Sequence, residues 1–243
     1  MKMDTRVFPD LEALSRGALD ELLKTMGDAV KQRGRFTIAL AGGRTPAKLY
    51  ELWARAESEG AHTPWDSVHL FWGDERFVPH DDLLSNYRMA REALIAHVPI
   101  PADNVHPMPG PKEFKTPAEA AEAYESDLRK FFGSGAPAFD LQLLGLGVEG
   151  HTASLFPGSP ALEEKKRWVA AVEAPAKPSE RLTLTPVVLN QGRDTFFLVS
   201  GGDKKEIIEA LRNEPESRLS KYPAGRIKPA GRVMWFLDKA AQG

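Results

Sequence analysis

A stretch near the middle of the chain, residues 139–160, constrains the fold more than any other: FDLQLLGLGVEGHTASLFPGSP. Its first eight residues form an apolar run typical of a buried strand. Gly145, Gly147 and Gly150 then let the backbone turn tightly, and His151 follows at once. A histidine at the end of a buried strand lies where open α/β sheets usually bind ligands. Because imidazole exchanges protons near neutral pH, His151 is a candidate acid–base residue.

The same glycines match the G-x-G-x-x-G fingerprint of dinucleotide-binding proteins. That fingerprint requires a long helix behind the third glycine, whereas Pro157 and Gly158 interrupt the chain within about two turns. The fingerprint also normally lies in the first strand–helix unit, and here it comes past the middle of the chain. A nicotinamide dehydrogenase is therefore a weak alternative.

The rest of the chain alternates between strand and helix patterns. Helical spacing of apolar residues predicts helices at 11–30, 46–57, 85–97, 116–132 and 205–211. Apolar or alternating runs predict strands at 36–41, 68–72, 139–146, 168–172, 181–185, 195–199 and 233–237, with one further short strand within 98–111. Residues 78–84, 133–137 and 214–229 are predicted loops, and the charged residues that follow Gly73 belong either on a solvated loop or in a polar pocket, because unpaired charges are costly to bury. This order predicts an α/β fold with a mainly parallel sheet and helices on both faces. No linker or repeat divides residues 1–243, so we expect a single domain.

Composition excludes several classes of protein. The net charge of −2 and the lack of a long basic run argue against nucleic acid or an anionic membrane as the main partner. Cysteine is absent, so the chain has no disulfide, zinc–thiolate site or cysteine nucleophile. The first ten residues contain no apolar signal core, and no apolar run is long enough to span a bilayer. We expect a cytoplasmic protein, and no obligate protein partner is evident.

A second glycine turn follows the strand at 36–41. It reads Gly42, Gly43, Arg44 and Thr45, and a helix begins with Pro46. Thr45 is expected to cap this helix. Free backbone N–H groups and the helix dipole would then form an anion site at one point. An ordinary strand–helix turn explains the same residues, and the turn alone does not decide between the two. It is not a Walker A loop.

Polar residues gather at the ends of four predicted strands: Gly42–Thr45, Asp74–Arg76, Glu149–His151 and Gly201–Lys204. Because the carboxyl ends of parallel strands lie along one edge, these groups are expected to converge. The cations at or near this edge are Arg44, Arg76, Arg181 and Lys204. Together with the backbone amides of the first turn they predict a phosphate-binding site. Any one of these cations alone is better explained as a solvated surface side chain, and it is the presence of four at these strand ends that favours a binding site.

His151 also has a simpler explanation as a structural hydrogen-bonding residue. Glu149, two positions earlier, favours catalysis because a carboxylate can orient the imidazole. A metal site is not expected, since His62, His69, His80, His97 and His106 show no ligand spacing. Ser154 is not expected to be a nucleophile, because G-x-S-x-G does not occur.

Five segments resemble, in order, the motifs of the 6-phosphogluconolactonase family: LAGGRTP, FWGDERFVP with SNYRMA, LLGLGVEGHTASLFPGSP, RLTLTP and VSGGDKKEII. They span nearly the whole chain, and GHTASLFPG is the most specific. The resemblance implies a modified Rossmann-like fold, shared with glucosamine-6-phosphate deaminases. It implies hydrolysis of 6-phospho-D-glucono-1,5-lactone to 6-phosphogluconate in the oxidative pentose phosphate pathway. It implies no metal or organic cofactor.

The motifs also imply roles for individual residues. His151 would be the base that takes a proton from water. Arg76 or a backbone amide would stabilise the oxyanion, and Glu149 or Asp74 would orient the imidazole or bind sugar hydroxyls. The phosphate would be held by the Gly42–Thr45 turn, Arg181 and Lys204. Many relatives have aspartate where this chain has Glu149, so a carboxylate is kept on a longer arm.

Two further functions compete. An aminosugar-phosphate deaminase–isomerase would carry an acid shortly after the G-H block, in a segment like F-N-E-P, where this chain reads Ser154-Leu155-Phe156-Pro157. Its G-D-E-R also differs from the M-D-E-Y of those enzymes. A non-catalytic sugar-phosphate sensor would keep the cations and lose the base. The sequence leaves open which of Asp74, Glu75 and Glu149 faces the substrate.

Overall fold

The computed structural model describes residues 3–243, so Met1 and Lys2 of the N-terminal stretch considered above lie outside it. The strands are β1 (Asp4–Phe8), β2 (Phe36–Leu40), β3 (Val68–Trp72), β4 (Asp74–Arg76), β5 (Val105–His106), β6 (Leu141–Leu144), β7 (Val169–Glu173), β8 (Glu180–Leu184), β9 (Asp194–Val199) and β10 (Arg232–Asp238). The α-helices are α1 (Leu11–Arg33), α2 (Arg44–Ser58), α3 (Asn86–Ala93), α4 (Pro117–Phe132), α5 (Pro186–Leu189), α6 (Lys205–Asn213), α7 (Glu216–Leu219), α8 (Pro223–Arg226) and α9 (Lys239–Gln242). No helix among residues 3–243 is long and apolar enough to cross a membrane.

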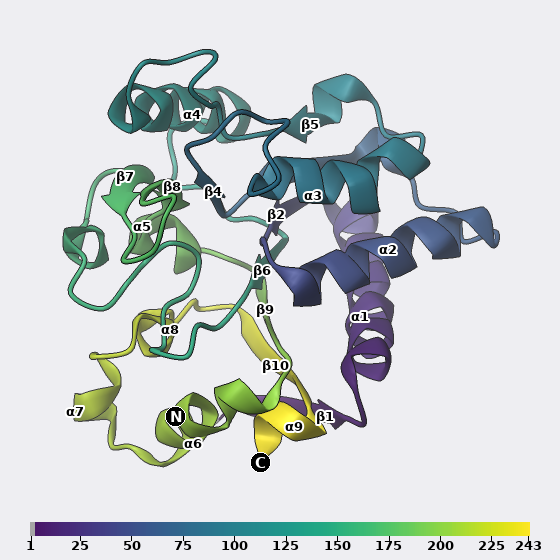
Figure 1. The fold of residues 1–243 in the computed structure, drawn as a ribbon. Coiled ribbons are helices and arrows are strands. Elements are labelled where there is room, and N and C mark those ends of the chain that lie inside the picture. The colour runs from purple at the N-terminus through teal and green to yellow at the C-terminus, as the bar shows by residue number, and fades with distance from the viewer. Residues whose placement is uncertain (1–2) are drawn as a thin grey trace.

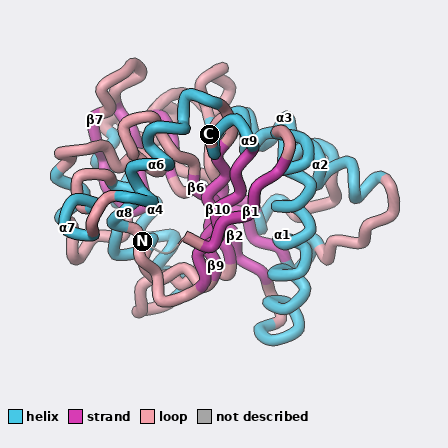
Figure 2. Tube along the Cα trace, turned by 90° about the horizontal axis from the view of Figure 1, so that it is seen from below, coloured by secondary structure: helices cyan, strands magenta, loops and turns pink. Residues whose placement is uncertain are grey.

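Seven strands form one sheet in the order β1-β10-β9-β6-β2-β3-β5, and every neighbouring pair is parallel. Helices α1 and α2 cover one face of this sheet, and α4 and the small second sheet lie on the other (Figures 1 and 2). The interior strand β2 is buried at all five positions. A parallel sheet covered on both faces needs such continuously apolar strands. The predicted α/β architecture is confirmed.

A second, three-stranded antiparallel sheet in the order β4-β8-β7 was not predicted. The strands expected at 168–172 and 181–185 do form, but they belong to this sheet. Asp74–Arg76 do not form the solvated loop that was one of the two expectations, because these residues form β4 and pair with β8. The other expectation, a polar pocket, holds for Asp74 and Arg76, which line a cavity. Three adjacent charges resemble a loop when only the local sequence is considered. Pairing with a distant strand overrides that local preference.

One edge strand was missed, and two smaller predictions are wrong. Strand β1 was not predicted, although it pairs with β10 and forms one edge of the large sheet. The loop expected at 214–229 contains the short helices α7 and α8. Thr45 does not cap α2, since that helix begins at Arg44, its N-cap is Gly43, and no side chain bonds to the cap. By contrast, the short strand expected within 98–111 is present as β5.

Two buried tyrosines fix the ends of neighbouring strands. The Tyr50 hydroxyl, on α2, accepts from the N–H of Ala41 at 3.0 Å and donates to its carbonyl at 2.9 Å. The Tyr124 hydroxyl, on α4, accepts from the N–H of Trp72 at 3.0 Å. Burial raises the pKa of both phenols, so they stay neutral donors and acceptors. The chain therefore leaves β2 and β3 in fixed directions.

Candidate active site

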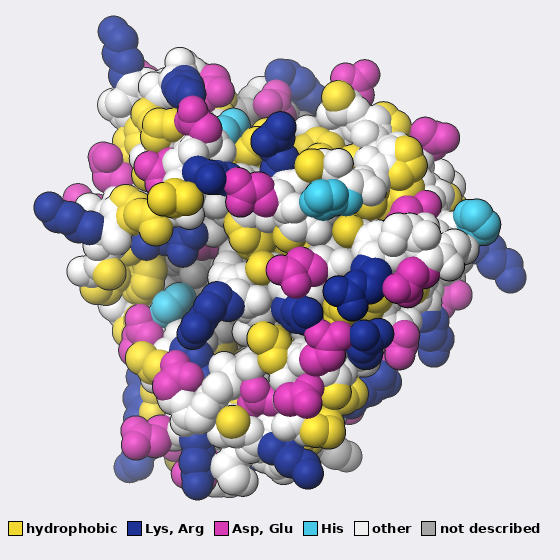
Figure 3. Space-filling view, turned by 45° about the vertical axis from the view of Figure 1, so that its right-hand side comes forward, with side chains coloured by type: hydrophobic (Ala, Val, Ile, Leu, Met, Phe, Trp, Pro, Cys, Tyr) yellow, Lys and Arg dark blue, Asp and Glu magenta, His cyan; other side chains and the backbone are white. Residues whose placement is uncertain are grey.

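A cavity of about 390 Å³ opens at the carboxyl edge of the large sheet, where β2, β3, β6 and β9 end. This volume lies in the range of small-molecule sites. The polar or glycine residues that line it are Gly42, Gly43, Gly73, Asp74, Arg76, Asn86, Gly145, Gly147, Glu149, His151, Ser154, Arg181 and Lys204. Toward the left of the face shown in Figure 3, Lys and Arg side chains lie above one histidine and to its right. The expected convergence of the four strand ends is therefore confirmed.

His151 and Glu149 form a hydrogen-bonded pair. Nδ1 of His151 lies 2.8 Å from Oε1 of Glu149, and the imidazole is 30% exposed. Burial alone would raise the pKa of Glu149, but its own backbone N–H, His151 and Lys204 lower it below the ordinary value. Since the carboxylate is ionised at neutral pH, the contact requires the proton on Nδ1. The lone pair of the neutral imidazole is then on Nε2.

Glycines shape the loop that carries this pair. A Cβ on Gly147 would lie 2.0 Å from Nδ1 of His151 and 2.7 Å from Oε2 of Glu149. Gly150 has φ of 85°, a conformation that favours glycine. The loop is closed by a bond from the N–H of Gly147 to the carbonyl of His151 at 2.9 Å. Phe156 packs on the imidazole with ring centroids 4.7 Å apart. The backbone of this loop and the ring of Phe156 therefore both restrict where the His151–Glu149 pair can lie.

Asp74 lines the cavity, but both of its oxygens have protein partners. Oδ2 accepts from the Ser154 hydroxyl at 2.6 Å, and Oδ1 receives a weaker donation from Asn86 at 3.5 Å. Ser154 is buried and bonded to Asp74 rather than to His151. The Ser154 hydroxyl therefore does not form the serine–histidine contact of an activated serine nucleophile.

Glu75 lies away from the cavity. Its carboxylate accepts from the backbone N–H groups of Arg76, Asn86 and Tyr87 at 2.7–2.8 Å, and from the Ser85 hydroxyl at 3.0 Å. Burial raises the pKa of Glu75, and the N–H donors oppose that shift. The side chain is 2% exposed and fixes the first turn of α3. Of the three acids left open by the sequence, only Asp74 and Glu149 border the cavity.

Arg76 and Arg181 face each other across the antiparallel strands β4 and β8. Arg76 donates through Nη1 to the carbonyl of Leu84 at 2.8 Å and to Oδ1 of Asn86 at 2.6 Å. Arg181 donates through Nε to the carbonyl of Pro178 at 2.8 Å. Within residues 3–243 neither guanidinium has a carboxylate within salt-bridge distance. Burial and the charge of Arg76 lower the pKa of Arg181. The charges of Asp74 and Glu75 oppose that shift. Two cations at one wall, neither of them in a salt bridge, are suited to an anionic ligand.

The cavity lining also includes Lys204 and the glycine turn at the N-terminus of α2. Lys204 contacts the exposed Asp203 at 3.0 Å and is itself 20% exposed. Gly42 and Gly43 line the cavity, whereas the side chains of Arg44 and Thr45 do not. Helix α2 has no side-chain cap and no acid in its first turn. Its first N–H groups are therefore available to an anion, as in other helix N-termini.

Two of the alternative chemistries find no support. The dinucleotide fingerprint would need a helix directly after Gly150, but residues 151–159 form turns and a single bridge. Within residues 3–243 there is no cluster of three or more His, Asp or Glu side chains arranged to hold a metal ion. The sequence analysis missed two residues of the site, Asn86 and Phe156. Both are in the motifs quoted above, but only their contacts reveal what they do.

The fold and the cavity define an α/β protein with a histidine–carboxylate pair and a wall that carries two arginines at the carboxyl edge of its sheet. Residues 9–235 match the family model described as glucosamine-6-phosphate isomerases/6-phosphogluconolactonase. The chain belongs to this family.

Individual relatives agree. The 6-phosphogluconolactonase of Nostoc sp. is 41% identical over 244 residues, covering 99% of this chain and 98% of the relative. The 6-phosphogluconolactonase of Synechocystis sp. is 44% identical over 216 residues, covering 88% and 86%. The structure of 6-phosphogluconolactonase from Trypanosoma cruzi superposes with a TM-score of 0.86 at 30% identity, covering 99% of this chain and 96% of that one.

Proposed function

We propose that this protein is a 6-phosphogluconolactonase, which hydrolyses 6-phospho-D-glucono-1,5-lactone to 6-phosphogluconate in the oxidative pentose phosphate pathway. The observation that carries the proposal is the His151–Glu149 pair, which leaves Nε2 as a free base in a cavity lined by three cations. The full-length relatives that carry this name support the same activity.

In the proposed reaction, Nε2 of His151 takes a proton from water as the water oxygen bonds to the lactone carbonyl carbon. The carbonyl oxygen becomes an oxyanion. When the tetrahedral intermediate collapses, the bond to the ring oxygen breaks, and that oxygen receives the proton from His151. Glu149 stabilises the imidazolium formed in between. A positioned base contributes about 10²–10⁴-fold to such a reaction.

The cations would serve the two negative groups of the substrate. We assign the phosphate to Lys204 and the uncapped N-terminus of α2, with Arg181 reaching it from the small sheet. Arg76 then stabilises the oxyanion, a role worth about 3–4 kcal/mol per donor in comparable acyl transfers. Arg44 and Thr45 do not line the cavity, so we assign the phosphate contact at this turn to the backbone of Gly42 and Gly43 and to the helix dipole behind them. We assign Asp74 an indirect role, because its carboxylate bonds Ser154 and, more weakly, Asn86 rather than His151.

The competing functions are less well supported. A deaminase–isomerase would need an acid after His151 to open the sugar ring, and here Phe156 packs on the imidazole instead. A sensor without catalysis would not need an imidazole oriented by a carboxylate.

We also propose that the protein acts in the cytoplasm as a single domain without an obligate partner. Its continuous hydrophobic core supports the single domain.

The test is hydrolysis of fresh lactone with and without the 6-phosphate, after subtraction of spontaneous decay. We expect fast loss of the phosphorylated lactone and little acceleration of the plain one. His151→Ala should lower kcat by about 10²–10⁴-fold while the protein stays folded. A near-normal rate in H151A would remove the base assignment. No acceleration of either lactone by the wild type would refute the function, and glucosamine 6-phosphate would be tested next.

A further inference from the structure

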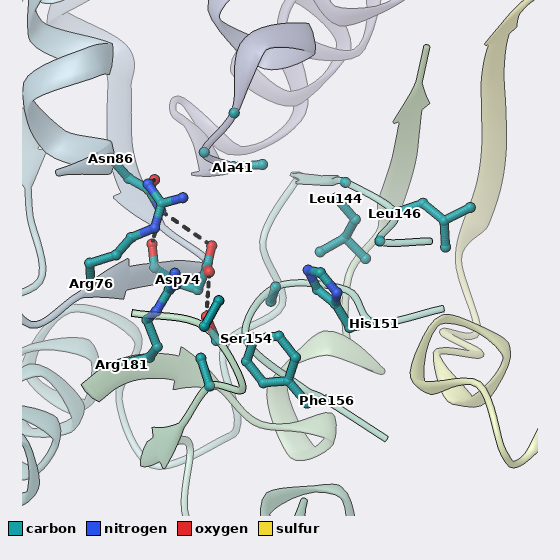
Figure 4. Close-up of a pocket in the computed structure, with 18 of the residues that line it drawn as sticks. Ala41, Asp74, Arg76, Asn86, Leu144, Leu146, His151, Ser154, Phe156 and Arg181 are labelled. Atoms are coloured by element: carbon teal, nitrogen blue, oxygen red, sulfur yellow. Dashed lines mark hydrogen bonds between the residues drawn. The ribbon is translucent and has the colours of Figure 1, made fainter. Parts of the chain in front are cut away.

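Asn86 is 1% exposed, yet it borders the cavity, and its side-chain amide has a partner on each side. Oδ1 accepts from Nη1 of Arg76 at 2.6 Å, and Nδ2 donates to the carbonyl of Asp74 at 2.9 Å. Figure 4 shows this chain of contacts continuing through the Asp74 carboxylate to Ser154. A guanidinium only donates and a carbonyl only accepts, so the orientation of the amide is determined by its partners.

The turn after β2 closes against the same amide. A Cβ on Gly42 would lie 2.0 Å from Oδ1 of Asn86, so only glycine leaves room for it. The backbone N–H of Asn86 is bonded to Oε1 of Glu75 at 2.8 Å, which fixes the residue at the start of α3. The backbone and the side-chain amide of Asn86 are therefore both held in place, so the amide can in turn fix the position of the Arg76 guanidinium.

Arg76 needs such support because its neighbour repels it. Arg181 stands directly opposite on β8, and like charges facing each other across strands are destabilising. A carboxylate would hold Arg76 more strongly, but it would also neutralise the guanidinium. An amide oxygen holds the group and leaves its full charge available to a ligand.

We infer that Asn86 is a positioning residue, which fixes the Arg76 guanidinium where it meets the oxyanion of the reacting lactone. This inference rests on the proposed function, because it takes Arg76 as the group that stabilises the oxyanion. It gives Asn86 a part in the reaction without direct contact with the reacting atoms. It also explains Gly42, whose missing side chain makes room for the amide.

A double-mutant cycle tests the inference with four proteins: wild type, Asn86→Ala, Arg76→Ala and the double variant. N86A should lower kcat by up to about 100-fold with little change in KM, since a 1 Å misplacement near the reaction has that cost. R76A should lose about 10²–10³-fold. The double variant should match R76A within about threefold, because Asn86 acts only through Arg76. Additive losses, or a change in KM alone, would overturn the inference.

Two further variants separate positioning from stability. Ser85→Ala removes the side-chain cap of the same helix, whose oxygen accepts from the N–H of Arg88 at 3.1 Å, and it does not touch Arg76. It also removes one donor to Glu75, at 3.0 Å, but Glu75 keeps its bonds from the three backbone N–H groups. It should lower Tm and leave kcat within about twofold of wild type; a loss like that of N86A would overturn the inference. Asn86→Asp keeps an acceptor but neutralises Arg76, and it should lose as much kcat as N86A. Wild-type kcat in N86D would contradict the need for a neutral acceptor.

A crystal structure of N86A supplies a readout that does not depend on the reaction. We expect the Arg76 guanidinium to leave its wild-type position, and an unchanged position would overturn the inference. If wild-type protein fails to hydrolyse the lactone while Arg76 moves in N86A, the proposed function fails and the positioning of Arg76 by Asn86 stands.

Discussion

Replacing Gly147 by alanine should disable the site by geometry alone. The new Cβ would lie 2.0 Å from Nδ1 of His151 and 2.3 Å from Cε1, whereas an ordinary contact is at least 3.4 Å. The difference between 2.0 and 3.4 Å requires the imidazole to move by about 1.4 Å. The contact with Glu149, now 2.8 Å, then cannot be kept. Because a displacement of about 1 Å near the reaction can cost 100-fold, kcat should fall by at least about 100-fold.

The assay is phosphorylated-lactone hydrolysis together with thermal unfolding. The backbone of Gly147 is not in the left-handed region, so alanine adds no backbone strain. We therefore expect a lower kcat with a Tm that falls by only a few degrees. Gly27→Ala is the matched control, since a Cβ there has no neighbour within 4 Å and the residue lies in α1. It should raise stability by about 0.5–1 kcal/mol and leave kcat unchanged. If G147A retained full kcat, the claim that catalysis depends on the position of the His151–Glu149 pair would be refuted.

Two further predictions concern binding and acid stability. Lys204→Ala should raise KM for the phosphorylated lactone about tenfold or more with a smaller change in kcat, because Lys204 is assigned to the phosphate rather than to the reacting carbonyl. An unchanged KM in steady-state kinetics would remove Lys204 from the phosphate site. Burial, aided by His69, lowers the pKa of His106 to about 4. The folded protein therefore favours neutral His106, and stability present above pH 6.5 is lost as the pH falls toward 4, because the unfolded chain takes up the proton first. For this half-buried ring we expect a loss of about 1–2 kcal/mol, smaller than the full shift implies. His106→Phe should flatten this part of the denaturation–pH curve, whereas an exposed-site control, His62→Phe, should not. A slope unchanged in H106F would contradict the assignment.

The parts of the site that lie close together in the sequence could be predicted from it. Glu149 and His151 are two positions apart in a glycine turn, so their contact depends mainly on local geometry. The four strand ends were placed together because parallel strands share a carboxyl edge. Lys204 was assigned to that edge for the same reason. These predictions rest on periodicity and on one topological rule, and neither requires knowledge of distant contacts.

The remaining features depend on contacts between distant segments. Asp74, Glu75 and Arg76 are three consecutive charged residues, but the structure gives each a different role. Pairing of β4 with β8 brings Arg181 opposite Arg76, and the start of α3 takes up Glu75. Asp74 is left to bond Ser154, which lies 80 residues further along the chain. No local pattern encodes these choices.

The sequence by itself therefore determined the α/β class, the edge of the sheet that carries the site, and the histidine with its carboxylate. Only the tertiary structure decided which acids border the cavity, that two arginines face each other across a small second sheet, and that Asn86 joins Arg76 to Asp74. The physical reason is that hydrophobic periodicity is a local property, so the spacing of apolar side chains over a few residues is enough to predict a helix or a strand. Hydrogen bonds between polar groups far apart in the chain depend on how strands pair and where helices begin, and these follow from packing of the whole molecule.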